Sequence, residues 1–101
     1  MSRYFLGIDI GGTKSHALVA NDQGVALGFA EGPAGSYEYV GWDGLRHALH
    51  EVTDRALASI KPAQARLSDR LSDRLSGVGL GIAGYDWPGE REPTRQAIAS
   101  L

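Results

Sequence analysis

The chain opens with an apolar run that stops at a pair of glycines, and this start limits the folds open to it. Residues 3–10 predict a buried strand. Its apolar side chains are Phe5, Leu6, Ile8 and Ile10. Gly11 and Gly12 predict a tight turn, because both positions can take positive φ. Residues 15–20 and 25–31 predict two further strands, and strands this close in sequence favour an antiparallel meander.

The second half of the chain predicts helices around one more strand, which gives an α/β fold class. A helix is expected over residues 43–60, with Asp43 as its N-cap and Pro62 just beyond its end. Its apolar positions recur at helical spacing: Leu45, Leu49, Val52, Ala56 and Ile60. Residues 77–83 predict a buried strand parallel to the first, reached through the helical crossover. Pro93 opens a last helix, since its missing N–H costs nothing in a first turn.

A short repeat lies between these elements. Residues 64–75 predict a short helix or an extension of the preceding one, and in this segment Leu-Ser-Asp-Arg at 67–70 is repeated at 71–74. The leucines form one stripe and each Asp lies close to an Arg, which is typical of a surface helix with weak ion pairs. A partner-binding stripe is the alternative.

Bulk composition excludes several classes of protein. The 101 residues suffice for one small domain with a modest core. A formal net charge of -2 gives no basic surplus for nucleic acid and no cationic segment for a membrane surface. The absence of cysteine excludes disulfides and thiolate metal sites. With no membrane-spanning run and no signal peptide, the cytoplasm is the expected compartment.

The side chains around the glycine pair suit phosphate and metal. Asp9 is a fixed acid for a metal ion, and Gly11 and Gly12 expose backbone N–H groups for phosphate oxygens. Thr13 and Lys14 add side-chain donors. No segment fits the Walker pattern GxxxxGK[ST], and the dinucleotide pattern GxGxxG fails at residues 7–12. A plain Gly-Gly hairpin with chance neighbours is the alternative.

Three observations weigh against a plain hairpin. Asp9 ends an otherwise apolar strand, where a charge is costly unless it has a ligand or a partner. Thr13 and Lys14 directly follow the glycines. The glycine-bounded strand end at residues 81–84 is expected at the same sheet edge, where the ligands of open α/β sheets bind.

These residues resemble a known family. Residues 7–14, Gly-Ile-Asp-Ile-Gly-Gly-Thr-Lys, look like the first phosphate motif of the sugar-kinase, actin and heat-shock-chaperone superfamily. Residues 32–36 and 79–86 are similar to its N-acetylglucosamine kinase branch, often described as the BadF/BadG/BcrA/BcrD ATPase family. The resemblance implies a ribonuclease H-like lobe, with a three-stranded antiparallel meander followed by a helix, a parallel strand and a helix. It also implies that residues 1–101 are the N-terminal part of a first lobe that continues past Leu101, and that the second lobe is absent.

The resemblance implies the roles of the residues at the nucleotide. Asp9 would hold Mg²⁺ through water. The turn of Gly11, Gly12, Thr13 and Lys14 would meet the β- and γ-phosphates of ATP. No catalytic residue is expected in this chain, because the family's base is an Asp at the end of the next strand, after Leu101. 

The resemblance also places the acceptor. Gly35, Ser36 and Gly84 would face the sugar. The branch often carries Asn where Ser36 stands and Ser where Ala83 stands, so the identity of the sugar stays open. Asp86 is the one acid of the last loop near a strand end, and it suits a turn better than a catalytic role.

The activity that the resemblance implies is ATP-dependent phosphoryl transfer to a sugar hydroxyl, with N-acetylglucosamine or a related amino sugar as acceptor. The isolated chain is expected to be inactive. An ATPase activator of a reductase is one alternative, although such activators carry iron–sulfur cysteines, and a non-catalytic ATP-binding or regulatory module is another. Expected partners are a small-molecule sugar and a second copy in a homodimer, because an unpaired sheet edge invites pairing. Neither nucleic acid nor membrane is expected as a partner.

Overall fold

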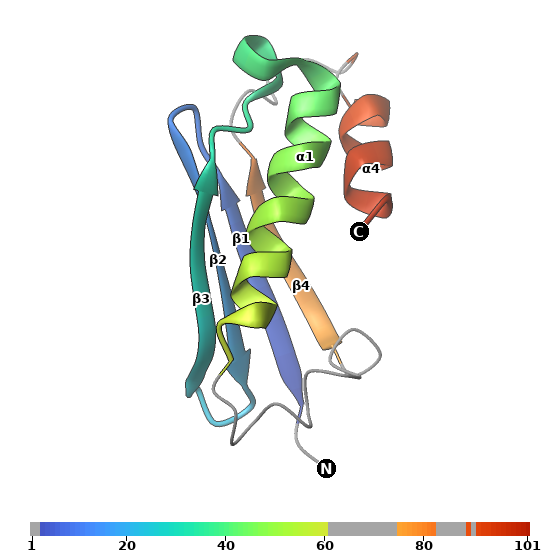
Figure 1. The fold of residues 1–101 in the computed structure, drawn as a ribbon. Coiled ribbons are helices and arrows are strands. Elements are labelled where there is room, and N and C mark those ends of the chain that lie inside the picture. The colour runs from blue at the N-terminus through green and yellow to red at the C-terminus, as the bar shows by residue number, and fades with distance from the viewer. Residues whose placement is uncertain (1–2, 61–74, 83–88, 90) are drawn as a thin grey trace.

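One four-stranded sheet with two helices makes up the described part of the chain. The computed structural model describes residues 3–60, 75–82, 89 and 91–101. The elements in chain order are β1 (Tyr4–Ile10), β2 (Lys14–Asn21), β3 (Ala26–Pro33), α1 (Tyr37–Ala58), β4 (Leu75–Ile82) and α4 (Arg91–Ala99) (Figure 1). The strand order is β3-β2-β1-β4. The first three strands pair antiparallel and β4 pairs parallel to β1, which confirms the predicted ribonuclease H-like α/β arrangement.

The two faces of the sheet differ in what covers them. Both α1 and α4 lie on one face, which we call the helix face, and the opposite face is the open face (Figure 1). Residues alternate along β1 between buried and exposed, so that Leu6 and Ile8 are buried while Phe5 is 39% exposed. The prediction of a strand buried throughout was therefore wrong for the open face, because no described helix covers Phe5.

The core lies between α1 and the helix face of the sheet. Helical spacing brings the predicted apolar stripe of α1 to one side, and four of its members have no exposed surface: Leu45, Leu49, Val52 and Ala56. From the sheet they meet the buried side chains Tyr4, Leu6, Ile8, Ile10, Ala17 and Val19. Each such burial stabilises the fold by about 1.5–3 kcal/mol for a large side chain, so this stripe fixes α1 against the sheet.

Glycines on β3 let α1 come close to the sheet. A Cβ at Gly28 would collide with the carbonyl oxygen of Ala56 and lie 3.0 Å from Ser59 Oγ. At Gly32 a Cβ would lie 3.1 Å from Val52 Cβ. Glycine weakens a strand interior, and Gly28 is required there by helix–sheet packing.

The helix α1 begins earlier than predicted. Its N-cap is Ser36 rather than Asp43, because the Ser36 carbonyl oxygen accepts hydrogen bonds from the N–H groups of Tyr39 (3.0 Å) and Val40 (3.1 Å). This makes one extra turn before the main helix. Gly41 joins the two parts at a kink with φ of 73°, a left-handed value that favours glycine.

The later elements also shift from their predicted bounds. The strand β4 begins at Leu75, which the sequence placed at the end of a helix, and the rest of the Leu-Ser-Asp-Arg repeat lies outside the described residues. The helix α4 begins at Arg91, so Pro93 occupies its first turn rather than its first position. In the part of the chain that the structure describes, no helix is both long and apolar enough to cross a membrane.

Candidate functional site

The connection between β1 and β2 is held from both of its sides. The Gly11 N–H donates to the Lys14 carbonyl oxygen at 3.0 Å, which closes the turn. The Gly11 carbonyl oxygen accepts from the Gly35 N–H at 3.1 Å. The turn is therefore fixed to the loop that precedes α1, and this loop carries Gly35 and Ser36, two of the three residues that the resemblance assigned to the sugar.

A side chain would meet different surroundings at the two glycines of the turn. A Cβ at Gly11 would lie 2.6 Å from the Lys14 carbonyl oxygen, so a side chain does not fit there. A Cβ at Gly12 would only make an ordinary contact of 3.7 Å with the ring of Tyr39. Neither residue has positive φ, so the predicted backbone reason for this pair was wrong. Protein packing thus requires Gly11 but leaves Gly12 unexplained.

The exposed backbone of the turn has hydrogen-bond donors without a partner among the described residues. No described group accepts a hydrogen bond from the N–H of Gly12 or of Thr13, and both residues are exposed. Gly12 and Thr13 thus present two backbone N–H groups that have no partner among the described residues. Exposed backbone N–H donors bind anions, so this turn fits a phosphate.

Asp9 lies on the open face, at the carboxyl end of β1. It pairs with His16 across β2 and with Gly81 along β4, so the predicted meeting of the two strand ends is confirmed as far as Ile82. A Cβ at Gly81 would lie 3.7 Å from Asp9 Oδ1. Because Asp9 is exposed, the cost of burying its charge is not a reason for it to have a ligand.

A shallow hollow of 280 Å³ lies beside Asp9 on the open face. Its lining residues come from all four strands: Gly7, Ile8, Asp9, His16, Ala17, Leu18, Phe29, Gly79 and Gly81. Three of these are glycines that leave backbone as the surface. A ligand at Asp9 can therefore approach from the open face without meeting side chains of β4.

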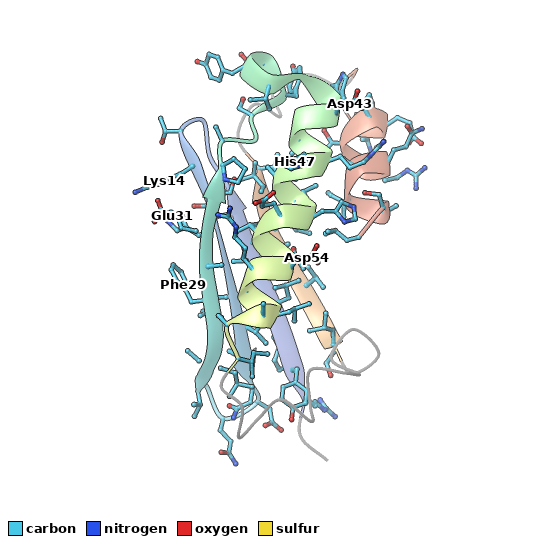
Figure 2. All side chains as sticks on the ribbon, in the orientation of Figure 1. Lys14, Phe29, Glu31, Asp43, His47 and Asp54 are labelled. Atoms are coloured by element: carbon cyan, nitrogen blue, oxygen red, sulfur yellow. The ribbon has the colours of Figure 1, made fainter. Side chains whose placement is uncertain are left out.

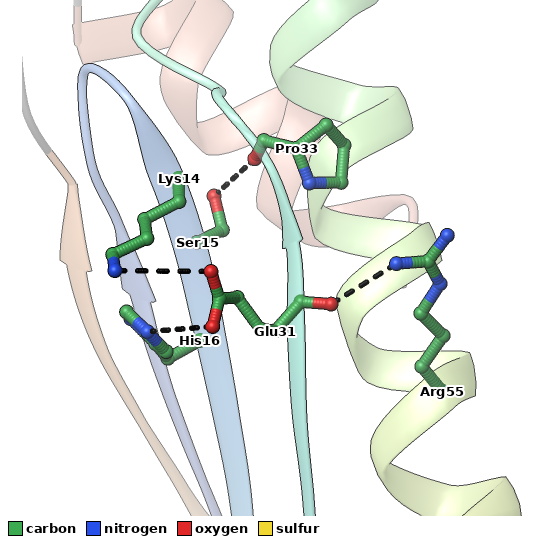
Figure 3. A network of polar contacts seen from close by, with 6 residues as sticks. All are labelled: Lys14, Ser15, His16, Glu31, Pro33 and Arg55. Atoms are coloured by element: carbon green, nitrogen blue, oxygen red, sulfur yellow. Dashed lines mark hydrogen bonds and ion pairs between the residues drawn. The ribbon is translucent and has the colours of Figure 1, made fainter.

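Lys14 points along the open face rather than over the turn. Its Nζ lies 3.8 Å from Glu31 Oε1, and Glu31 Oε2 lies 3.9 Å from His16 Nε2 (Figure 3). The ring of His16 stacks on Phe29 with centroids 5.9 Å apart. Lys14, Phe29 and Glu31 all point away from α1 (Figure 2). The ion pair is exposed and worth little, so the ammonium can turn toward an anion at low cost.

The residues predicted to face a sugar have different surroundings. Gly35 is buried, and a Cβ there would lie 2.5 Å from Ile10 Cγ2 and 2.9 Å from Ala48 Cβ. Ser36 is only 3% exposed and serves as the N-cap of α1. Gly84 and Asp86 lie outside the described residues. The sugar-binding roles of Gly35, Ser36 and Gly84 stay predictions.

Tyr39 is the neighbour of the turn that the sequence did not single out. Its ring approaches Gly12, yet the side chain is 79% exposed. Tyr37 stacks on Trp42 across the kink, with centroids 4.1 Å apart and planes 2° from parallel. The signal in the sequence was two tyrosines in a glycine-rich loop, but only the fold brings one of them to Gly12.

Comparison with known proteins adds a likeness of fold. No protein-family model matches the chain, and no curated protein matches it. Among solved structures, the chain is similar to a crystal structure described as a "Putative N-acetylglucosamine Kinase" from Chromobacterium violaceum. The TM-score is 0.54 and the identity 19%, over 82% of this chain and 36% of that one. The chain thus shares the fold of part of that protein and spans about a third of its length.

Proposed function

We propose that this chain is the phosphate-binding part of an ATP-dependent sugar kinase. The observation that carries the proposal is the turn after β1, where Gly12 and Thr13 present N–H groups that no described group accepts. The likeness of fold to the Chromobacterium violaceum protein supports the proposal. The chain spans 36% of that protein, which fits a part of an enzyme rather than the whole. In this proposal the rest of the enzyme, including the catalytic base and the adenosine site, lies in a longer protein.

The residues at the turn have separate tasks in this proposal. Gly12 and Thr13 donate N–H groups to phosphate oxygens, and Lys14 leaves Glu31 to add its positive charge. Asp9 holds Mg²⁺ through water, since this ion binds proteins through one or two carboxylates and keeps several waters. Bound Mg²⁺ neutralises charge on the phosphate oxygens during transfer. The acceptor is the hydroxyl of N-acetylglucosamine or a related amino sugar.

Binding at the turn is tested on the chain itself by NMR. We expect Mg-ATP to shift the amide signals of Gly12 and Thr13 and to leave those in the β2–β3 turn unchanged. Asp9→Asn should remove the dependence on Mg²⁺. Asp22→Asn is the matched control, because Asp22 is an exposed acid in the turn between β2 and β3. If Mg-ATP shifts neither amide, the chain does not bind phosphate at this turn.

Transfer itself is tested on the longer protein with a panel of sugars and Mg-ATP. We expect phosphorylation of an amino sugar. ATP hydrolysis without phosphorylation of any sugar would favour an ATPase that activates a reductase, and ATP binding without turnover would favour a regulatory module. Either result would exclude the kinase.

A further inference from the structure

The loop from Gly35 to Gly41 holds an exposed aromatic ring at the phosphate turn. The ring of Tyr39 lies where a Cβ of Gly12 would touch it at 3.7 Å. The side chain is 79% exposed, more than any other large apolar or aromatic side chain among the described residues. Such exposure leaves most of this flat aromatic ring in water. This face lies beside the backbone N–H groups that would receive phosphate.

Several contacts fix the backbone that carries this ring. The Ser36 carbonyl oxygen accepts the N–H groups of Tyr39 and Val40, which closes the turn. The Tyr37–Trp42 stack spans the kink at Gly41. The loop is joined to the phosphate turn by the hydrogen bond from Gly35 N–H to the Gly11 carbonyl oxygen. The ring is thus attached to a backbone already ordered before a ligand arrives, which lowers the entropy cost of binding.

The position of Tyr39 separates it from the metal side of the turn. Asp9 and Lys14 belong to the open face, whereas Tyr39 comes from α1, which covers the helix face. In phosphoryl transfer the attacking and leaving oxygens lie roughly in line on opposite sides of the phosphorus. A reacting acceptor comes within about 3–3.5 Å of the phosphorus. With a phosphate bound at the turn, a side chain beside Gly12 and away from Asp9 would therefore lie within reach of the acceptor. The nucleobase would lie farther away, because the other phosphates and the ribose separate it from the transferred phosphate.

We propose that Tyr39 forms a wall of the acceptor subsite and stacks its ring on the apolar face of a pyranose. This inference rests on the proposed kinase function. It moves the contact with the sugar from Ser36, which is 3% exposed, to the ring three residues later. A pyranose suits this wall, because one face of such a ring presents C–H groups that pack on an aromatic surface while its hydroxyls stay in water. Tyr39 would thereby contribute to the choice of acceptor.

The test compares three variants with the natural chain by NMR, with N-acetylglucosamine added in the presence of Mg-ATP. Sugar binding is read from the amide signal of Val40, and nucleotide binding from that of Thr13. Tyr39→Ala should weaken sugar binding by about tenfold, the scale of a lost aromatic contact. Tyr39→Phe should stay within about twofold, because the ring face remains. Phe5→Ala is the matched control, an aromatic truncation at the far end of β1.

The outcomes separate this inference from the proposed function. Equal sugar affinity in Tyr39→Ala and the natural chain overturns the stacking role, and so does the absence of sugar binding while Thr13 still responds to Mg-ATP. An equal loss in Tyr39→Ala and Tyr39→Phe assigns the contact to the phenol hydroxyl and also overturns it. If Thr13 does not respond to Mg-ATP, the phosphate site fails, whatever the sugar does. Weaker Mg-ATP binding in Tyr39→Ala with sugar affinity kept would make Tyr39 a nucleotide contact instead.

Discussion

The two edges of the sheet are finished in different ways. At the β3 edge, side chains of α1 and of its C-cap residue bind two outward backbone groups. Phe29 N–H donates to Ser59 Oγ at 2.9 Å, and Arg55 Nη1 donates to the Glu31 carbonyl oxygen at 3.0 Å. At the opposite edge lies β4, and no described group pairs with its outer side. Its eight residues, Leu75–Ile82, include no charge and no proline. Natural sheets protect a free edge with charged residues or proline. Among the described residues, β3 is therefore a closed edge and β4 an open one.

The largest difference between the edges should appear when a methyl group is added to each. Gly28→Ala in β3 should lower the free energy of unfolding by about 1–3 kcal/mol, because the new Cβ collides with the carbonyl oxygen of Ala56. Gly79→Ala in β4 should raise it by about 0.5 kcal/mol, since no atom lies within 4 Å and the unfolded chain loses freedom. Urea unfolding of both variants measures this. Similar values for the two would contradict the difference in packing.

The next effect concerns association through β4. We expect the isolated chain to pair with a second copy along this edge at high concentration, in line with the homodimer expected from the sequence. Gly79→Lys should weaken this pairing at least about tenfold, because a charged side chain on an edge strand opposes strand addition. Gly79→Ala is the matched control and should associate like the natural chain. Sedimentation equilibrium measures this association. If the natural chain stays monomeric at the highest concentrations, the prediction is wrong.

A smaller effect is expected from opening the closed edge. Ser59→Ala removes the oxygen that accepts from Phe29 N–H, and the free energy of unfolding should fall by about 1 kcal/mol. Amide hydrogen exchange at Phe29 should become faster, while exchange at Val19, inside the sheet, should follow only the global change. Unchanged exchange at Phe29 would mean that the hydrogen bond to Ser59 does not protect this edge in solution.

The smallest effect concerns the helix near the open edge. The hydrogen bond from Arg95 lowers the pKa of Glu92 in α4, and the charge of Arg95 acts in the same direction. The pair therefore stabilises the fold at pH values above the ordinary carboxyl pKa, and this contribution is lost as the pH falls through the lowered one. Glu92→Gln should lower stability slightly at about pH 7 and not at about pH 2.5. Denaturant unfolding of the natural chain and of Glu92→Gln at both pH values measures the difference in stability. A larger difference in acid than at neutral pH would contradict the prediction.

Periodicity in the sequence was enough to predict the order of the helices and strands. It was not enough to predict which faces of the sheet are covered. The apolar stripe of α1 and the close spacing of the first strands predicted the meander, the crossover and the parallel strand. The exposure of Phe5 could not be predicted, because an apolar run looks the same whether one or both faces are covered. The start of α1 was missed because Gly41 is a helix breaker in the sequence, and here its positive φ joins two helical parts.

The candidate site was predictable where its residues are neighbours in sequence. Asp9 and the turn after it follow from one short motif, and the meeting with Gly81 follows from parallel strand ends. The different surroundings of Gly11 and Gly12 depend on distances to Lys14 and to the ring of Tyr39 from α1. No local sequence pattern contains these distances. Tertiary packing also decides that Ser36 is buried while Tyr39 is exposed.

The hydrogen bond from Gly35 N–H to the Gly11 carbonyl oxygen couples the phosphate turn to the loop that carries Tyr39. In the proposed kinase, a shift of the phosphate turn on ligand binding would be transmitted to the loop that carries Tyr39, and the converse holds equally. By thermodynamic reciprocity, any factor by which the first ligand raises affinity for the second applies in the other direction as well. In the proposed kinase, one backbone contact would thus let the nucleotide and the acceptor favour each other's binding.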